Sequence, residues 1–261
     1  MVEIHRIQTK VFQNRIKIKM DLKNKIAVVT GGSSGIGRAI SVALAKEGCK
    51  VVFTYNSNEK GANETLKEIG KDGFKFKADM HEEKDLESLF DFVKEKFGKL
   101  DILVNNAGAN RPRALFDTEV WKEIFQVNLF ATVFCSGRAV ELMQDGGKIL
   151  NVSSVYAEGK ACFKGLPAYG ASKAAINHFT QTMAKNFAPK VLINAIAPGY
   201  VQTPLWGEIT KKEFEKSGKE QLIERMIQSE EIANMAVSII KNDAMTGEIV
   251  VVDGGISLKT V

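Results

Sequence analysis

A tyrosine and a lysine four residues apart, Tyr169 and Lys173, are the side chains in this sequence best suited to acid–base chemistry. On a helix, residues i and i+4 share a face, so the phenol and the ammonium lie close together. A neighbouring ammonium favours the phenolate and lowers the pKa of a tyrosine from its usual value of about 10. The pair therefore predicts a general acid/base that exchanges a proton with a substrate oxygen.

The same spacing occurs a second time, at Tyr156 and Lys160. Local sequence separates the two copies, because Tyr169 leads into an apolar pattern with helical spacing. Tyr156 is followed by Glu158-Gly159 and by no periodic run. We therefore place the acid/base at Tyr169 and keep Tyr156 as the alternative.

A glycine-rich turn, Thr30-Gly31-Gly32-Ser33-Ser34-Gly35-Ile36-Gly37, follows an apolar run and precedes a helical pattern. Glycines let the backbone turn tightly and approach a pyrophosphate, and the helix N-terminus supplies free N–H groups. The spacing is GxxxGxG rather than GxGxxG. A dinucleotide site is the functional interpretation, and a tight turn without a ligand is the structural one.

The turn also matches GxSxG with Ser33 as the serine, the nucleophile elbow of serine hydrolases. A hydrolase needs a histidine after the serine, and only His81 and His178 follow. His178 lies within a helical run, and the elbow leaves Gly37 unexplained. A serine hydrolase is therefore kept only as an alternative from another class.

A third motif, Asn105-Asn106-Ala107-Gly108, ends the apolar run 100–104. It places amide groups at the carboxyl edge of a sheet, where α/β folds bind ligands. The alternative is a turn built from good turn formers.

Apolar runs alternate with helix-length segments past residue 20, which predicts a doubly wound α/β domain with a mostly parallel sheet of seven strands. The predicted strands are Ile26–Val29, Val51–Phe53, Phe74–Phe76, Ile102–Val104, Ile149–Val152, Val191–Ile196 and Ile249–Val252. The predicted helices are Gly35–Gly48, Glu59–Gly70, Glu82–Phe97, Asp117–Gln144, Pro167–Phe187 and Ser229–Lys241. The segment 199–228 falls outside the alternation, and its length predicts a lid.

The composition is that of a folded protein, with 261 residues, 44% of them hydrophobic and 26% charged. This length fits one domain with a large core. No apolar stretch approaches the ~18 residues that a membrane span needs. The three cysteines are widely spaced and form neither a disulfide framework nor a CxxC metal site. We expect a cytoplasmic protein without a metal site or a membrane partner.

Residues 1–19 carry five basic residues and one acidic residue, and so hold +4 of the formal net charge of +5. A nucleic-acid-binding protein spreads its basic excess over a folded face, so we expect no nucleic acid partner. Three interpretations of this basic N-terminal extension stay open: an accessory segment ahead of a start at Met20, a helix packed on the domain or on another subunit, and a targeting peptide.

Taken together, TGxxxGIG, NNAG and YxASK resemble the short-chain dehydrogenase/reductase family, in its branch of ~250 residues. The resemblance covers residues 20–257. Further matches are Asn128, Pro198-Gly199 with Thr203, and Asp253-Gly254-Gly255. The resemblance implies a single Rossmann domain over 20–261, its sheet flanked by helices on both faces.

The resemblance also implies a mechanism, hydride transfer between a nicotinamide and a carbonyl or secondary alcohol. Tyr169 would exchange the proton, and Lys173 would lower the pKa of that tyrosine and hold the ribose. Ser154 would bind the substrate oxygen, and Asn128 would support a water relay to Lys173. Ser154 and Tyr169 are 15 positions apart, about two more than is usual in the family, so the loop between them, with Lys160, Cys162 and Phe163, is enlarged.

An acid at the end of the second strand would bind the ribose 2′-OH of NAD(H) and repel a 2′-phosphate. The chain has Tyr55-Asn56-Ser57 there, so we expect NADP(H). NAD(H) stays possible, because Ser34 stands where the family often has an arginine. The residues predicted to bind the cofactor are Gly31, Ser33, Ser34, Gly35, Ile36, Gly37, Tyr55, Asn56, Ser57, Asp79, Asn105, Ala107, Gly108, Tyr169, Lys173, Pro198, Gly199, Val201 and Thr203.

The substrate is less well indicated. The segment 106–116, with Arg111 and Arg113, resembles 3-oxoacyl-carrier-protein reductases, and such arginines meet acidic groups. Leu205, Trp206 and Phe214 would form an apolar lid wall. Sugar or polyol dehydrogenases share the same skeleton, and a non-catalytic dinucleotide-binding protein is a third hypothesis. The family resemblance implies a homotetramer.

Overall fold

A single parallel sheet organises the protein. The structure is a computed structural model that describes residues 20–112, 115–158, 165–207 and 209–259. The basic extension 1–19 lies outside the described residues. Seven strands pair in the order β3-β2-β1-β4-β5-β6-β7, and every neighbouring pair is parallel. The strands are β1 (Ile26–Val29), β2 (Lys50–Tyr55), β3 (Gly73–Lys77), β4 (Leu100–Asn105), β5 (Met143–Val152), β6 (Val191–Pro198) and β7 (Ile249–Val252).

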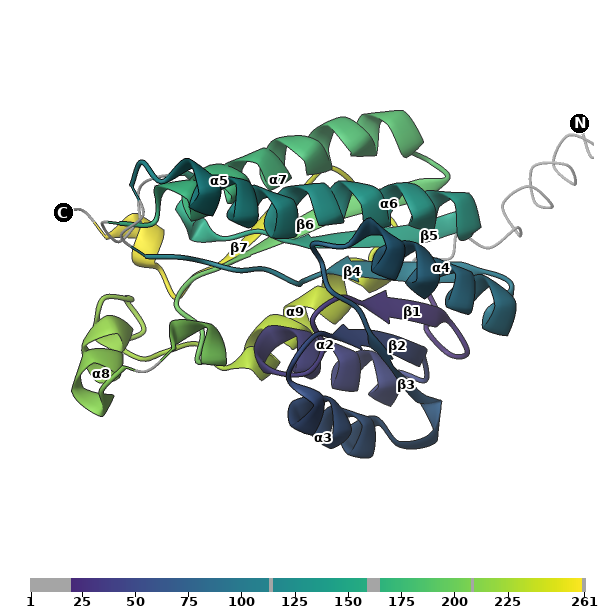
Figure 1. Ribbon diagram of the computed structural model, residues 1–261, viewed down its shortest axis with the longest axis horizontal. Helices are drawn as coiled ribbons and strands as arrows, with labels where there is room; N and C mark the ends of the chain where they lie inside the picture. The colour runs from purple at the N-terminus through teal and green to yellow at the C-terminus, as the bar shows by residue number, and fades with distance from the viewer. Residues whose placement is uncertain (1–19, 113–114, 159–164, 208, 260–261) are drawn as a thin grey trace, which may run out of the picture.

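Helices cover both faces of this sheet, as Figure 1 shows, with α2, α3 and α9 on one face and α4 to α7 on the other. Because both faces are covered, the central strands are mostly apolar, and β1 and β4 are buried along their whole length. The helices are α2 (Gly35–Lys46), α3 (Glu59–Ile69), α4 (Glu83–Phe97), α5 (Thr118–Phe125), α6 (Ala131–Leu142), α7 (Pro167–Phe187), α8 (Lys211–Lys219) and α9 (Ser229–Lys241).

The prediction of one helix over Asp117–Gln144 is wrong in two respects. A π-helical turn, η2 (Gln126–Phe130), separates α5 from α6 and inserts an extra residue into the helical register. The helix also ends at Leu142, because Met143 is extended and pairs with Leu100 as the first residue of β5. The apolar periodicity shows neither feature, since both change the backbone without changing the residue pattern.

The chain order reverses between β1 and β4, which lie side by side in the middle of the sheet. Ligands of open α/β sheets bind at such a switch point, outside the carboxyl ends of the strands. The loops after β1, β2, β4, β5 and β6 all reach this edge.

The predicted lid follows β6. It contains the short 3-10 turn η4 (Pro204–Trp206) and the helix α8, whose N-terminus carries a capping box between Thr210 and Glu213. The two ends of the lid meet again, because Val201 and Ile227 form a parallel bridge. Among the helices described, none is both long enough and apolar enough to cross a membrane.

Candidate active site

The glycine-rich turn forms a cradle at the carboxyl end of β1. Gly31 and Gly35 have φ values of +68° and +55°, which only glycine adopts without strain. Gly37 has an ordinary φ, but a Cβ at this position would overlap the carbonyl oxygen of Gly31 and the side-chain amide of Asn106. The first turn of α2 therefore lies directly against the turn before it, leaving free backbone N–H groups at a helix N-terminus.

Asn106 fixes this cradle to the neighbouring strand. Its Nδ2 donates to the carbonyl oxygens of Thr30, at 2.9 Å, and Gly31, at 3.1 Å. The Thr30 hydroxyl accepts hydrogen bonds from the backbone N–H groups of Asn106 and Ala107, both at 3.0 Å. Asn106 therefore has the structural role that the alternative interpretation of the NNAG motif gives it. It joins the ends of β1 and β4.

Asn105 has a different environment from the one predicted. It is buried, and its Nδ2 donates to Ser136 on α6 and to Asn151 on β5. It does not line the cavity described below, because its side chain leaves the strand on the side that faces α6. Its contacts connect strands and helix beneath the site.

Tyr169, in the first turn of α7, meets Ser154 just beyond the end of β5. Both residues line the cavity. Burial raises the pKa of the Tyr169 phenol, and its hydrogen bond with the Ser154 hydroxyl opposes that rise. The phenol is therefore held protonated and next to a second hydroxyl, an arrangement that suits a proton donor.

Lys173 lies beneath the tyrosine, one helical turn further along α7. Its Nζ donates to the carbonyl oxygen of Val152 at 2.7 Å and lies 5.7 Å from the centroid of the Tyr169 ring. Burial lowers the pKa of Lys173 to about 8. The predicted lowering of the Tyr169 pKa by Lys173 is not found, because burial of the phenol is the larger effect and the ammonium is bonded to a carbonyl oxygen instead.

Asn128 sits in the π-helical turn and connects the loop after β4 to α7. Its Oδ1 accepts from the backbone N–H of Ala109 at 2.8 Å, and its Nδ2 donates to the Ala109 carbonyl oxygen and to the Ser172 hydroxyl. A Cβ on Gly108 would lie 3.4 Å from Asn128 Oδ1 and 3.6 Å from Lys173 Nζ. The extra residue of the π turn thus brings Asn128, Gly108 and Lys173 to one point.

A cavity of about 630 Å³ runs from the glycine cradle to Tyr169. The predicted site residues that line it are Gly31, Ser33, Ser34, Gly35, Ile36, Gly37, Tyr55, Asn56, Asp79, Ala107, Gly108, Ser154, Tyr169, Lys173, Pro198, Gly199, Val201 and Thr203. Ser57, Asn105 and Asn128 are not among the lining residues. The cavity's length, its glycine cradle and the free N–H groups at the start of α2 fit a dinucleotide.

The far end of the cavity lies where β2 and β3 end. β2 ends at Tyr55, and Asn56 Nδ2 donates to Asp79 Oδ2 at 3.0 Å. The backbone N–H of His81 is the main reason that the pKa of Asp79 is lowered, and the His81 ring also contacts that carboxylate at 2.8 Å. The sequence motifs predict no role for His81 except as the partner of a nucleophile, but its place two residues after Asp79 puts it at this end of the cavity.

The serine hydrolase hypothesis fails on geometry. Ser33 lines the cavity, but the ring of His81 contacts Asp79, and His178 is exposed on α7 away from the cavity lining. Neither histidine is placed as the base that a nucleophilic serine requires.

The end of the cavity beyond Tyr169 has an apolar and aromatic wall. Its residues are Tyr156, Leu166, Tyr200, Leu205 and Trp206. Tyr156 contacts the ring of Tyr169 edge to face, with 5.6 Å between centroids. Leu205 and Trp206 are predicted for this wall and line it, whereas Tyr200 is not predicted, because a single tyrosine after Pro198-Gly199 forms no recognisable pattern.

The predicted positive charge beside the cleft is partly neutralised by a neighbouring carboxylate. Arg111 lines the cavity, but it forms an ion pair of 2.7 Å with Glu123, which lines it too. Arg113 and the loop residues Lys160, Cys162 and Phe163 lie outside the described residues. Among the described side chains, no group of three histidine, cysteine or acidic residues is placed to hold a metal ion.

Comparisons with known proteins agree with this geometry. A family model described as Enoyl-(Acyl carrier protein) reductase matches residues 31–257. Glucose 1-dehydrogenase 2 of Bacillus subtilis is 35% identical over 256 residues, covering 91% of this chain and 96% of the relative. A 3-oxoacyl-[acyl-carrier-protein] reductase of Aquifex aeolicus is 32% identical, covering 91% and 99%.

Solved structures give the same result. A short-chain dehydrogenase/reductase from Serratia marcescens superposes with a TM-score of 0.84 at 31% identity, covering 91% of this chain and 100% of that one. A short-chain dehydrogenase from Burkholderia cenocepacia in complex with NADP has a TM-score of 0.83 at 29% identity, covering 91% and 99%.

The fold and the site define an oxidoreductase that binds NAD(P) and acts on CH–OH or C=O groups. The chain belongs to the short-chain dehydrogenase/reductase family. The predictions of the family, of its enzymatic class and of a doubly wound sheet of seven strands are confirmed.

Proposed function

We propose that the protein is an NADPH-dependent ketone reductase of the 3-oxoacyl-thioester type. The observation that carries this proposal is the juxtaposition of Tyr169 and Ser154 at an aromatic, apolar end of the cavity. An apolar wall suits an acyl chain, whereas a polyol there would lose hydrogen bonds that it makes to water. The Aquifex aeolicus relative acts in this substrate class by its name.

The bound nicotinamide would supply the hydride. Tyr169 would donate its proton to the carbonyl oxygen as the alcohol forms, because burial keeps the phenol protonated. Ser154 would donate a hydrogen bond to the same oxygen and so favour its developing negative charge. The ammonium of Lys173 has three N–H donors, and one of them binds the Val152 carbonyl oxygen. The other two would bind the hydroxyl groups of the nicotinamide ribose. Asn128 would hold the Gly108–Ala109 backbone, and through it a relay of water to Lys173.

NADPH is proposed over NADH because no carboxylate ends β2. Tyr55 and Asn56 line this end of the cavity, and the nearest carboxylate, Asp79, is already bonded to Asn56 and His81. The neighbouring structure from Burkholderia cenocepacia contains NADP, which supports the same choice.

The test is to mix the protein with NADPH and the acetoacetyl thioester of N-acetylcysteamine, and to follow the loss of the reduced cofactor's absorbance. We expect steady turnover with NADPH and much slower turnover with NADH. A sample that binds NADPH but leaves the thioester unchanged would contradict the acyl assignment.

Oxidation of a sugar or polyol is the second candidate, supported by the 35% identity to glucose 1-dehydrogenase 2. It is measured in the reverse direction, with NADP⁺ or NAD⁺ and a panel of sugars and polyols. Turnover of a sugar at a kcat/KM above that of the thioester would favour this candidate.

A homotetramer is proposed as the assembly, on the family resemblance. Phe130 and Val133 are exposed apolar residues on η2 and α6, and Leu258 is one beyond β7, so apolar surface is available on two sides of the subunit. Light scattering after size-exclusion chromatography tests this. A mass of one subunit at micromolar concentration would contradict it. The cytoplasmic location stays a prediction.

A further inference from the structure

A continuous series of aromatic rings runs from the proton donor to the lid helix. Tyr156 contacts Tyr169 edge to face at 5.6 Å, and Tyr200 lies 6.3 Å from Tyr156. Trp206 meets Tyr200 edge to face at 5.5 Å, and Phe214 on α8 lies 6.4 Å from Trp206. All but Phe214 also line the cavity. The wall nearest the reacting oxygen is therefore aromatic.

Tyr200 is the ring at the centre of this series, and its backbone is fixed on both sides. Gln221 is fully buried, and its Oε1 accepts from the Tyr200 N–H at 3.0 Å. The Nε2 of Gln221 donates to the Tyr200 carbonyl oxygen at 3.2 Å and to the Arg225 carbonyl oxygen at 2.6 Å. Because one amide side chain meets both backbone groups of Tyr200, the backbone that carries the ring cannot shift without breaking a buried hydrogen bond.

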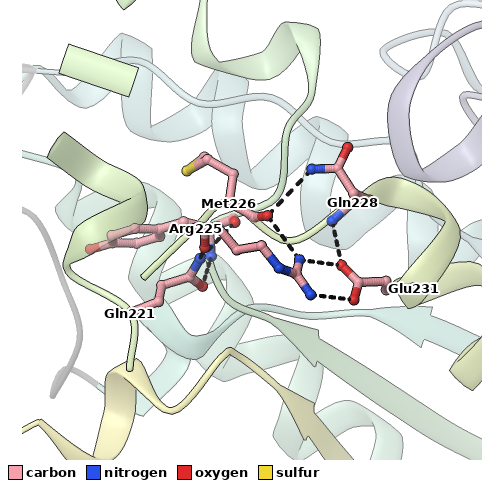
Figure 2. A network of polar contacts seen from close by, with 6 residues as sticks. Gln221, Arg225, Met226, Gln228 and Glu231 are labelled. Atoms are coloured by element: carbon pink, nitrogen blue, oxygen red, sulfur yellow. Dashed lines mark hydrogen bonds and ion pairs between the residues drawn. The ribbon is translucent and has the colours of Figure 1, made fainter. Parts of the chain in front are cut away.

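The segment that carries Gln221 is itself anchored to a core helix, as Figure 2 shows. The guanidinium of Arg225 binds both carboxylate oxygens of Glu231, at 2.7 and 2.8 Å, and also donates to the Met226 carbonyl oxygen. The backbone N–H of Gln228 donates to the same carboxylate at 2.9 Å. Glu231 lies in the first turn of α9, so this network holds the returning end of the lid against the domain.

The other end of the lid is held by Trp206. Its Nε1 donates to the Val201 carbonyl oxygen at 2.8 Å, and Val201 is the residue that bridges to Ile227. Both ends of the lid are thus held against the domain by hydrogen bonds, and the aromatic wall lies at these two ends. A wall fixed in this way selects shape rather than adapting to each substrate.

We propose that Tyr156 and Tyr200 are specificity-determining residues for a flat apolar group bonded to the reacting carbonyl carbon. The substrate class is then the aryl ketones, and within the proposed function the 3-aryl-3-oxoacyl thioesters. Gln221 is a positioning residue that acts through Tyr200. This inference rests on the proposed function for its thioester part only.

The physical reason is ring packing. An aromatic group placed edge to face against two tyrosines gains a quadrupole contact that a saturated ring of the same size lacks. One such contact is worth about tenfold in kcat/KM at most. The puckered ring is also thicker than the aryl ring, so it fits a rigid wall less well.

The experiment compares benzoylacetyl and 3-cyclohexyl-3-oxopropanoyl thioesters of N-acetylcysteamine, which share ring size and chain length. They differ in the flatness of the ring and in its conjugation with the carbonyl group, and only the first of these differences depends on the protein. Acetophenone and cyclohexyl methyl ketone repeat the comparison without a thioester. We expect the ratio of aryl to saturated kcat/KM to be about tenfold higher in the wild type than in Tyr200→Leu, and the aryl member of each pair to bind more tightly to the wild type in calorimetry. A ratio that is the same in both proteins would overturn the proposal.

Three variants assign the effect to its residues. Tyr200→Leu is expected to remove the preference between the paired ketones, and Tyr200→Phe, which keeps the ring, is expected to retain it. Gln221→Met has a similar length without the amide, and is expected to raise KM for the aryl ketone several-fold with a smaller change in kcat. A Gln221→Met protein that folds, shown by circular dichroism, and keeps the full preference would overturn the positioning role.

The series also separates this inference from the proposed function. Turnover of the free ketones with an aryl preference, but of neither thioester, would contradict the 3-oxoacyl function and leave the aromatic selectivity standing. Turnover of both thioesters, with a rate ratio that Tyr200→Leu leaves unchanged, would contradict the aromatic selectivity and leave the 3-oxoacyl function standing. Turnover in neither series, with no aryl preference in binding, would contradict both.

Discussion

The ammonium of Lys173 donates a 2.7 Å hydrogen bond to the carbonyl oxygen of Val152, the last residue of β5. This bond holds the lysine at the edge of the sheet, beside Gly108, and 5.7 Å from the centre of the Tyr169 ring. The side chain therefore stands between the loop after β4 and the proton donor. Its position suits a residue that binds a ribose beside the proton donor.

Replacing Tyr169 by phenylalanine is expected to lower kcat for thioester reduction by about 10²- to 10⁴-fold, the usual contribution of a general acid. The ring and its packing remain, so NADPH binding, measured by fluorescence titration, should change little. Tyr156→Phe removes the neighbouring hydroxyl while keeping its ring, and we expect it to lose less than tenfold. Full activity in Tyr169→Phe would transfer the proton donor to Tyr156.

Lys173 is expected to contribute stability that grows as the pH rises from about 8 to about 10.5. Burial lowers its pKa to about 8 in the folded protein, against 10.5 for an ordinary lysine. In this window the unfolded chain binds the proton that the folded protein has released, so raising the pH favours folding. Between these two pKa values the gain is on the order of 3 kcal/mol.

The measurement is urea denaturation at several pH values, for the wild type and for Lys173→Met. Other titrating groups are common to both proteins, so the difference between their free energies of unfolding isolates Lys173. We expect the free energy of unfolding of the wild type to increase relative to that of the variant as the pH rises from about 8 to about 10.5. A constant difference would show that the pKa of Lys173 is not lowered.

Much of the fold follows from the sequence because the sheet is buried on both faces. The predicted limits of β1, β7, α7 and α9 agree with the structure. β1, β7 and α9 are each an apolar run or period bounded by polar residues, and α7 begins at Pro167, a residue that favours the first turn of a helix. The two helices on either side of η2 were predicted as one, because a π turn preserves the apolar pattern. The helical register at η2 depends on contacts with residues that are distant in the sequence, those of Asn128 with Ala109 and Ser172.

The site was predictable where residues near in sequence form it, and not where distant loops meet. The glycine cradle and the Tyr169–Lys173 pair are local, and the structure brings both to one cavity. Tyr200, Gln221 and His81 lie on separate loops, and only the fold shows what they contact. The direction of the Tyr169 pKa shift was also mistaken, because burial cannot be read from a spacing.

Gly37→Ala is expected to destabilise the protein by several kcal/mol and to abolish NADPH binding. The added Cβ would overlap the Gly31 carbonyl oxygen and the Asn106 amide, both of which are backbone or closely bonded groups that cannot move aside. Gly137→Ala is the matched control, since Gly137 lies inside α6 with no atom within 4 Å of the added Cβ. We expect that control to gain about 0.5–1 kcal/mol in urea denaturation.

Introducing an acid at the end of β2 is expected to reverse the cofactor preference. Tyr55 is the better position, because Asn56→Asp would place a second carboxylate against Asp79, whose Oδ2 lies 3.0 Å from Asn56 Nδ2. In Tyr55→Asp the carboxylate would accept hydrogen bonds from the ribose hydroxyl of NADH and repel the 2′-phosphate of NADPH. We expect kcat/KM with NADPH to fall at least 100-fold, the equivalent of about 2.7 kcal/mol.

The ratio of kcat/KM for NADPH to that for NADH measures this preference in the wild type, in Tyr55→Asp and in Ser57→Ala. Ser57 is exposed and does not line the cavity, so its substitution tests whether any change in this loop alters the ratio. Circular dichroism and thermal unfolding show whether loss of the largely buried Tyr55 ring has unfolded the domain. A folded Tyr55→Asp protein with an unchanged ratio would place the 2′-phosphate site elsewhere, and a wild type that uses both cofactors equally would remove the case for NADPH itself.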